Sequence, residues 1–265
     1  MSGVMADPGP PGWHGKLPAL GDFASRRLGP EFIEPWDGWL AGGLHALRGA
    51  APDHWLQHYL SSPSWRFLLQ PGVLPMGRAN GGGRAAPGAQ AWAGVLVPSV
   101  DRVGRYFPFT LAQPLGSAAL DCLQLQALWR GLTAWDDLAR DALHDDWTAE
   151  QLEAELHRHH AAHGGLGAAT GAATGAATAA ATGAEPEPGA AAAGALPREA
   201  GQALPVAGAG DAAFAMVAQL QPLAWQQAHG CSWWQAVPDV GPPRLWLVRG
   251  LPASLGLLFD GGQAP

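Results

Sequence analysis

The sequence predicts an α/β domain with helices on both sides of one sheet, and three observations favour this class. Apolar runs of strand length alternate with longer segments whose apolar residues recur every three or four positions, as in strands and amphipathic helices. The chain of 265 residues is 48% hydrophobic, which is enough to bury a sizeable core. The last predicted strands are too few to form a second domain, so we expect them to complete the same sheet.

The elements of the first half follow from apolar spacing and from the positions of prolines. Residues 30–47 show helical spacing, and Pro35 predicts that the regular helix begins there, after one preliminary turn. A short helix is expected over 52–60. Strands are expected at 65–69, which prolines bound, and at 91–97, which would be the central strand.

The second half continues the alternation. A strand is predicted over 106–113, and a long helix capped by Ser117 follows it. Thr148 and Gln151 match a capping box, which predicts the start of another helix. Beyond residue 204 we expect a helix, two strands and a last short helix, at 209–220, 231–234, 244–248 and 253–259.

Residues 164–204 are nearly all Gly, Ala, Thr and Pro, and Gly-Ala-Ala-Thr is repeated within them. Such a segment has too little apolar surface to offset its conformational entropy. The sequence therefore predicts a single domain, formed by 13–163 and 205–265, that a disordered insertion interrupts. A disordered tail is expected at 1–12.

Composition and charge exclude several classes of function. A net charge of −7 provides no basic field for nucleic acid or an anionic membrane. No run reaches transmembrane length, and residues 1–12 lack the apolar core of a secretory signal. We therefore expect a cytoplasmic protein without direct membrane insertion. Cys122 and Cys231 belong to no C-x-x-C pair, so neither a disulfide framework nor a zinc knuckle is indicated.

Cofactor and metal sites are not predicted either. The glycines at 80–84 lack the Gly-Lys-Ser/Thr ending of a phosphate-binding loop, so they predict a flexible loop. The histidines between 157 and 163 fall at a frayed helix end, where no second shell would hold metal ligands in place.

A polar turn follows the predicted central strand at residues 97–108. Crowded there between two prolines are Ser99, Asp101, Arg102 and Arg105. Asp101 can pair with either arginine, because a forked guanidinium holds a carboxylate through two hydrogen bonds. Two interpretations remain open: a structural salt bridge that braces the turn, or a site for a ligand or partner.

Two further groups of residues are candidates. Lys16 is the only lysine in the chain, which predicts either a need for a compact ammonium or an accident of composition. Trp36 and Trp39 belong to a helical stripe of the kind that forms core more often than recognition surface.

Four separated motifs carry a resemblance to a known family. They are Gly15-Lys16-Leu17-Pro18 with Gly21-Asp22-Phe23 and Arg27; Phe32 with Trp36-Asp37-Gly38-Trp39-Leu40; Trp65-Arg66-Phe67; and Pro98-Ser99-Val100-Asp101-Arg102-Val103-Gly104-Arg105-Tyr106-Phe107-Pro108. Together they resemble the TagF family, also called ImpM, which accompanies type VI secretion systems. The similarity covers about residues 13–160, and weakly Ser232-Trp233-Trp234 and Gly250-Leu251-Pro252.

This resemblance implies a three-layer α/β/α sandwich, in agreement with the helices expected on both sides of the sheet, and we expect that sheet to be mixed. It implies a cytoplasmic, non-enzymatic protein that acts after translation as a negative regulator of the assembly or firing of the secretion machine. It further implies binding to the forkhead-associated scaffold protein of the same cluster, in opposition to activation through threonine phosphorylation. The resemblance supplies no catalytic residues, and the Gly/Ala/Thr insertion departs from the family pattern.

Two functional hypotheses follow. In the first, polar and aromatic residues converge on a partner-docking surface beside exposed aromatics such as Trp13; the candidates are Lys16, Asp22, Arg27, Trp36, Trp39, Arg66, Ser99, Asp101, Arg102 and Arg105. In the second, a hydrolase-like or small-anion-binding pocket uses Ser99 as nucleophile and Lys16 as its base, with an arginine holding an anionic substrate. Ser99 lacks the Gly-x-Ser-x-Gly elbow.

Overall fold

One sheet organises the computed structural model of the chain, which describes residues 9–74, 90–116, 120, 122–166, 199–200, 203–205, 229–237 and 244–259. The strands within these residues are β1 (Gly12–Gly15), β2 (Ala24–Arg26), β3 (Ser64–Leu69), β4 (Ala91–Val97), β5 (Phe109–Gly116), β6 (Ala203–Pro205), β7 (Cys231–Val237) and β8 (Arg244–Arg249). The helices are α1 (Pro30–Ala50), α2 (Trp55–Leu60), α3 (Cys122–His144), α4 (Ala149–His163) and α8 (Gly256–Phe259).

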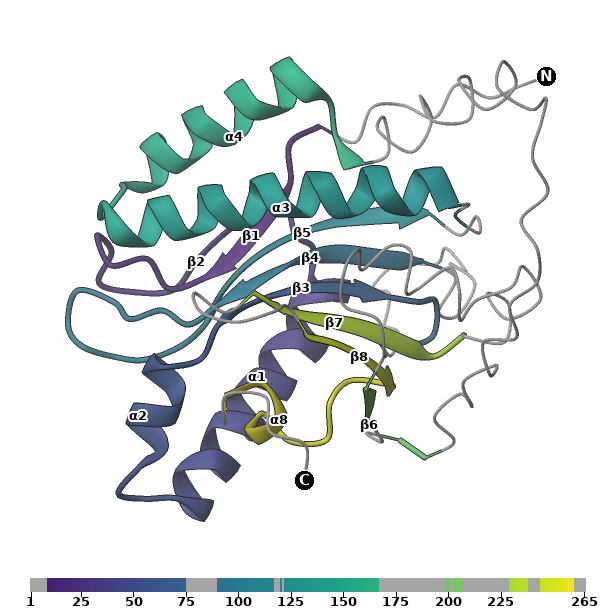
Figure 1. The fold of residues 1–265 in the computed structure, drawn as a ribbon. Coiled ribbons are helices and arrows are strands. Elements are labelled where there is room, and N and C mark those ends of the chain that lie inside the picture. Colours follow the sequence, from purple (N-terminus) through teal and green to yellow (C-terminus); the bar gives the residue numbers. More distant parts are fainter. Residues whose placement is uncertain are drawn as a thin grey trace, which may run out of the picture.

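The strands are arranged in the order β2-β1-β5-β4-β3-β7-β8-β6 (Figure 1). Each pair of neighbours in this sheet runs antiparallel, so the expectation of a mixed sheet is wrong for the described strands. The turn at 98–108 illustrates the reason. It reverses the chain between β4 and β5, and antiparallel neighbours joined in this way need no helical crossover. β3 pairs with both β4 and β7, so strands from before and after residues 164–204 lie side by side.

Each face of the sheet carries its own hydrophobic core. Helices α3 and α4 cover one face, and α1, α2 and α8 lie on the other (Figure 1). Val95 belongs to the first core and Leu96 to the second, as expected for a strand whose successive side chains point to opposite faces. Burial on both faces explains why β4 reads in the sequence as a continuous apolar run.

Helix α1 begins at Pro30, which corrects the start predicted at Pro35. Proline is tolerated in the first turn, where its missing N–H has no partner to lose. Pro35 lies inside the helix and cannot donate to the carbonyl of Glu31. The helix continues because residues on both sides of Pro35 are buried in the second core; these are Phe32, Trp36, Leu40, Leu44 and Leu47.

Other boundaries differ by a few residues. The strand expected at 106–113 is β5, which begins at Phe109 because Tyr106 forms only an isolated bridge with Val100. The expected loop at 80–84, the Ser117 cap, the helix at 209–220 and most of the segment 164–204 lie outside the described residues. Within the part that is described, the helices are too short or too polar to cross a bilayer.

The capping box predicted at the start of α4 is confirmed. The Gln151 N–H donates to Thr148 Oγ1 at 3.3 Å, and the Thr148 N–H donates to Gln151 Oε1 at 2.8 Å. These two bonds satisfy backbone donors that the first turn of a helix would otherwise leave without partners.

Thr148→Ala should therefore lower the free energy of unfolding by about 1 kcal/mol, measured by urea denaturation. The matched control is Thr133→Ala at an exposed position within α3, where alanine is the better helix former and the change should be close to neutral. Equal losses in the two variants would contradict a specific role for the cap.

Candidate functional site

The turn between β4 and β5 is closed by its own backbone. The Asp101 N–H donates to the Arg105 carbonyl at 3.1 Å, and the Gly104 N–H donates to the Asp101 carbonyl at 2.9 Å. Gly104 has a φ of +80°, a conformation that glycine adopts without the strain a side chain would cause. The turn therefore has one defined shape.

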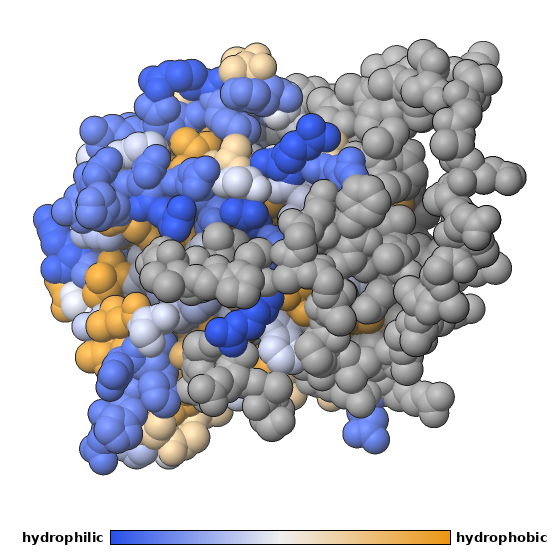
Figure 2. Space-filling view, in the orientation of Figure 1, coloured by the Kyte–Doolittle hydropathy of each residue, from blue (hydrophilic) through white to orange (hydrophobic). Residues whose placement is uncertain are grey.

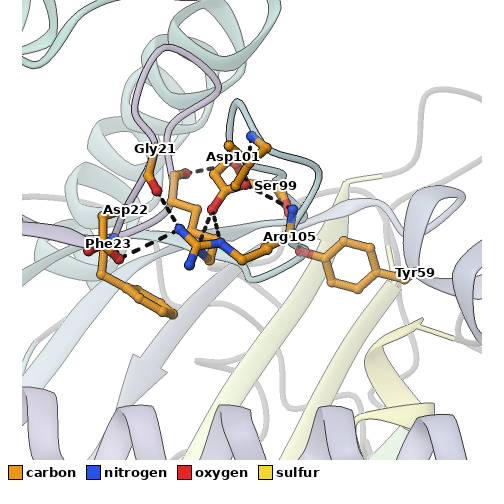
Figure 3. A network of polar contacts seen from close by, with 9 residues as sticks. Gly21, Asp22, Phe23, Tyr59, Ser99, Asp101 and Arg105 are labelled. Carbon is orange, nitrogen blue, oxygen red and sulfur yellow. Dashed lines mark hydrogen bonds and ion pairs between the residues drawn. The ribbon is translucent and has the colours of Figure 1, made fainter.

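The carboxylate of Asp101 lies at the centre of this turn (Figure 3). Its Oδ1 accepts the backbone N–H groups of Val103 at 3.0 Å and Arg105 at 2.8 Å. Its Oδ2 accepts Lys16 Nζ at 2.5 Å and Arg105 Nε at 2.7 Å. Because Lys16 directly follows β1, this one carboxylate ties the turn to the N-terminal segment.

Two opposing effects set the pKa of Asp101. Burial raises the pKa, but the hydrogen bonds from Lys16 and Arg105 lower it by more, so the pKa lies well below its usual range. The carboxylate is therefore ionised at neutral pH beside two cations. Of the two pairings left open by the sequence, the one between Asp101 and Arg105 is present.

The loop between β1 and β2, at residues 16–23, is held against the turn. The Leu20 carbonyl accepts the Arg102 N–H at 3.0 Å, and the Gly21 carbonyl accepts the Arg105 guanidinium. Asp22 Oδ1 lies 3.7 Å from Arg105 Nη2, an exposed ion pair that contributes little to stability. Backbone carbonyls and the buried Lys16–Asp101 pair therefore fix the two loops together.

Ser99 is buried at the base of the turn and holds it to two other segments. Its Oγ donates to the Lys16 carbonyl at 2.7 Å. Its N–H donates to the Tyr59 hydroxyl, which in turn donates to the Ser99 carbonyl, both at 2.8 Å (Figure 3). Burial raises the pKa of Tyr59, so the hydroxyl keeps the proton that it donates. Tyr59 is absent from the predicted site because helical aromatic spacing does not reveal which loop a ring meets.

Six of the predicted site residues lie together at the turn. Five of them are joined through side chains or carbonyls; these are Lys16, Asp22, Ser99, Asp101 and Arg105. The sixth, Arg102, is joined through its backbone N–H. Arg66 does not join them, which corrects the expected convergence. It lies within β3 and its Nη2 donates to Asp136 of α3 at 3.2 Å, whereas the turn lies beyond the end of β4. Arg27 also pairs elsewhere, with Glu153 of α4.

The tryptophans of the predicted site belong to the packing of the fold. Trp36 is fully buried, and its Nε1 donates to Thr110 Oγ1 at 3.0 Å. Trp39 Nε1 donates to the Pro252 carbonyl at 2.9 Å. Trp13, expected to be an exposed aromatic, is also fully buried, because β1 places its ring in the core beneath α3 and α4.

Other features of the chain lie apart from the turn. Residues of α3 and the end of α4 line a cavity of about 470 Å³; they include Arg130, Trp135, His159 and His163. Within the described residues, no group of three or more His, Cys, Asp or Glu side chains is placed to hold a metal ion.

The turn itself is suited to recognition, because its buried polar groups are satisfied while Arg102, Val103 and Arg105 face solvent.

One family model and a solved structure are similar to the chain. The family model described as "TagF N-terminal domain, Type VI secretion system-associated" matches residues 12–159. Among solved structures, the crystal structure of PA0076 from Pseudomonas aeruginosa PAO1 is similar, with 27% sequence identity and a TM-score of 0.57 over 96% of this chain and 96% of that chain. No curated protein matches the sequence.

Proposed function

Because the chain belongs to the TagF family of proteins associated with type VI secretion, we propose that it is a non-enzymatic, post-translational negative regulator of that machine. It acts in the cytoplasm by binding the forkhead-associated scaffold protein of the same secretion cluster. Binding opposes the threonine-phosphorylation pathway that activates assembly or firing.

The state of the polar groups in the turn supports a binding role. Lys16 Nζ is bound by the Asp101 carboxylate, and Ser99 Oγ donates to the Lys16 carbonyl, away from the ammonium. A nucleophile needs an adjacent base within hydrogen-bond reach of its proton. The two groups that an enzymatic role would use are instead engaged in bonds that shape the turn.

The test is isothermal titration of the purified protein against the scaffold encoded in its own cluster, with an unrelated forkhead-associated protein as control. Micromolar or tighter binding to the cognate scaffold alone is expected. In cells, overproduction of the protein should reduce secretion and deletion should raise it. Absence of both binding and any secretion phenotype would overturn the proposal.

The non-enzymatic part of the proposal has its own test. Generic ester and phosphoester substrates should show no turnover by the purified protein. A turnover that Ser99→Ala abolishes, while the variant keeps the wild-type melting temperature, would replace the regulator with the hydrolase-like alternative.

A further inference from the structure

We propose that Phe23, Arg102 and Val103 are the residues that touch the partner, and that they bind a peptide segment carrying a carboxylate next to an apolar side chain. We call these three residues the contact surface. This inference rests on the proposed function and narrows the predicted docking site, since Lys16, Asp101 and Arg105 then act by holding the contact surface in place.

Exposed apolar side chains single out this part of the molecule. Among the described residues, the large hydrophobic side chains that face solvent are Phe23 (45% exposed), Leu60 (58%) and Val103 (63%). Two of these three lie on the pair of loops that the Arg102 N–H and the Arg105 guanidinium join. Figure 2 shows apolar residues reaching the surface at the left edge, where Figure 1 places the turn between β4 and β5.

The Phe23 ring is held in position although almost half of it is exposed. It meets Phe107 edge-on with ring centroids 4.8 Å apart, and it stacks on His14 at 6.0 Å. Lys16 Nζ lies 4.2 Å from the ring centroid. A ring that is already ordered loses little conformational entropy when a partner covers it, and aromatic residues of this kind are frequent anchors of interfaces.

The charge of the contact surface comes from Arg102. Its side chain is exposed, and its guanidinium makes no hydrogen bond or ion pair with any residue that the structure describes. Arg105 differs, because its guanidinium already contacts Asp101, Gly21 and Asp22. Of the two arginines of the turn, Arg102 is therefore the one whose guanidinium is open to a carboxylate of the partner. The chain as a whole has a net charge of −7, which otherwise disfavours acidic partners.

A carboxylate fits this surface better than a phosphoryl group. One guanidinium pairs with one carboxylate through two parallel hydrogen bonds, whereas a phosphoryl group of nearly two negative charges is typically met by several arginines. The carboxylate would lie on Arg102, and apolar side chains of the same peptide segment would cover Val103 and Phe23.

The experiment compares scaffold binding by the wild type with binding by Arg102→Glu, Arg102→Lys, Val103→Ser and Phe23→Ser. Arg102→Glu should weaken binding about tenfold or more, and Arg102→Lys should weaken it less. The matched control is Arg158→Glu on the exposed side of α4, where the arginine pairs with Glu155. Melting temperatures verify that all variants are folded. In parallel, amide NMR signals are recorded with a peptide of alternating glutamate and leucine, and with its lysine counterpart.

Each outcome decides a different point. If the scaffold binds, the contact-surface variants weaken it and Arg158→Glu does not, the inference is supported. If the scaffold binds equally to all variants, the inference is overturned and the proposed function stands. If the scaffold does not bind but the glutamate peptide alone shifts the Arg102 and Val103 signals, the contact surface stands and the scaffold is the wrong partner. If neither the scaffold nor the peptide binds, the inference is overturned, and so is scaffold binding as the mechanism of the proposed function.

Discussion

Replacing Trp36 with alanine is expected to lower the free energy of unfolding by about 3–5 kcal/mol. The indole is fully buried, and its ring centroid lies 4.9 Å from that of Phe67 and 6.1 Å from that of Trp234. Removal leaves a cavity between α1 and the sheet. It also leaves the buried Thr110 hydroxyl without the Nε1–H that donates to it at 3.0 Å, which adds a cost for an unsatisfied polar group.

Urea denaturation measures this loss, and two variants serve as controls. Trp36→Phe keeps most of the volume and loses the hydrogen bond, so it should cost less than Trp36→Ala. Trp39→Ala removes a ring that is only partly buried, so its cost should also be smaller. A near-neutral Trp36→Ala variant that no longer bound the scaffold would contradict the assignment of Trp36 to the core and return it to the docking surface.

The sequence predicts those features that depend on local pattern. Apolar runs locate β3, β4, β7 and β8 because such runs are bounded by turn residues. The capping box of α4 follows from a short spacing and is present. Short spacing also predicts an ion pair of Asp101 with Arg102 or Arg105, and the structure shows the one with Arg105. The antiparallel sense of the sheet does not follow, because a strand buried on both faces reads as the same apolar run in either sense.

The sequence does not predict which residues of distant segments contact one another. Lys16 and Asp101 are 85 positions apart, and their contact depends on β1 lying beside β5 in the sheet. Glu153, which accepts Trp13 Nε1 at 2.5 Å and also binds Arg27, has no signal in the sequence beyond its place on a helix. Sheet order decides which polar groups meet, and residue spacing does not encode sheet order.

The second large effect is expected for Asp101→Asn, which should lower the melting temperature on the order of 10 °C at neutral pH. The asparagine carbonyl can still accept one pair of N–H groups. Its amide nitrogen, however, would face Lys16 Nζ and Arg105 Nε, which are donors themselves. The Lys16 ammonium is buried and would lose its counter-charge, whereas the half-exposed guanidinium of Arg105 can be solvated.

The pH dependence of this effect has a definite sign. The folded-state pKa of Asp101 lies below its ordinary value, so the unfolded chain binds the proton more tightly and the stabilisation is fully present above about pH 4. It is lost progressively as the pH falls further toward the folded-state pKa. The difference in melting temperature between wild type and Asp101→Asn should therefore be constant near neutrality and shrink below about pH 4. A difference that stays unchanged at low pH would contradict an ionised, buried Asp101.

A double variant separates the charge pair from the shape of the turn. Lys16→Met removes the buried ammonium, so combining it with Asp101→Asn removes both charges of the pair and leaves neither one buried alone. We expect the double variant to be more stable than Asp101→Asn alone, because an uncompensated buried charge costs more than the loss of the pair. If the two losses instead add, the carboxylate stabilises the protein through its bonds to the Val103 and Arg105 backbone, and Lys16 contributes independently of it.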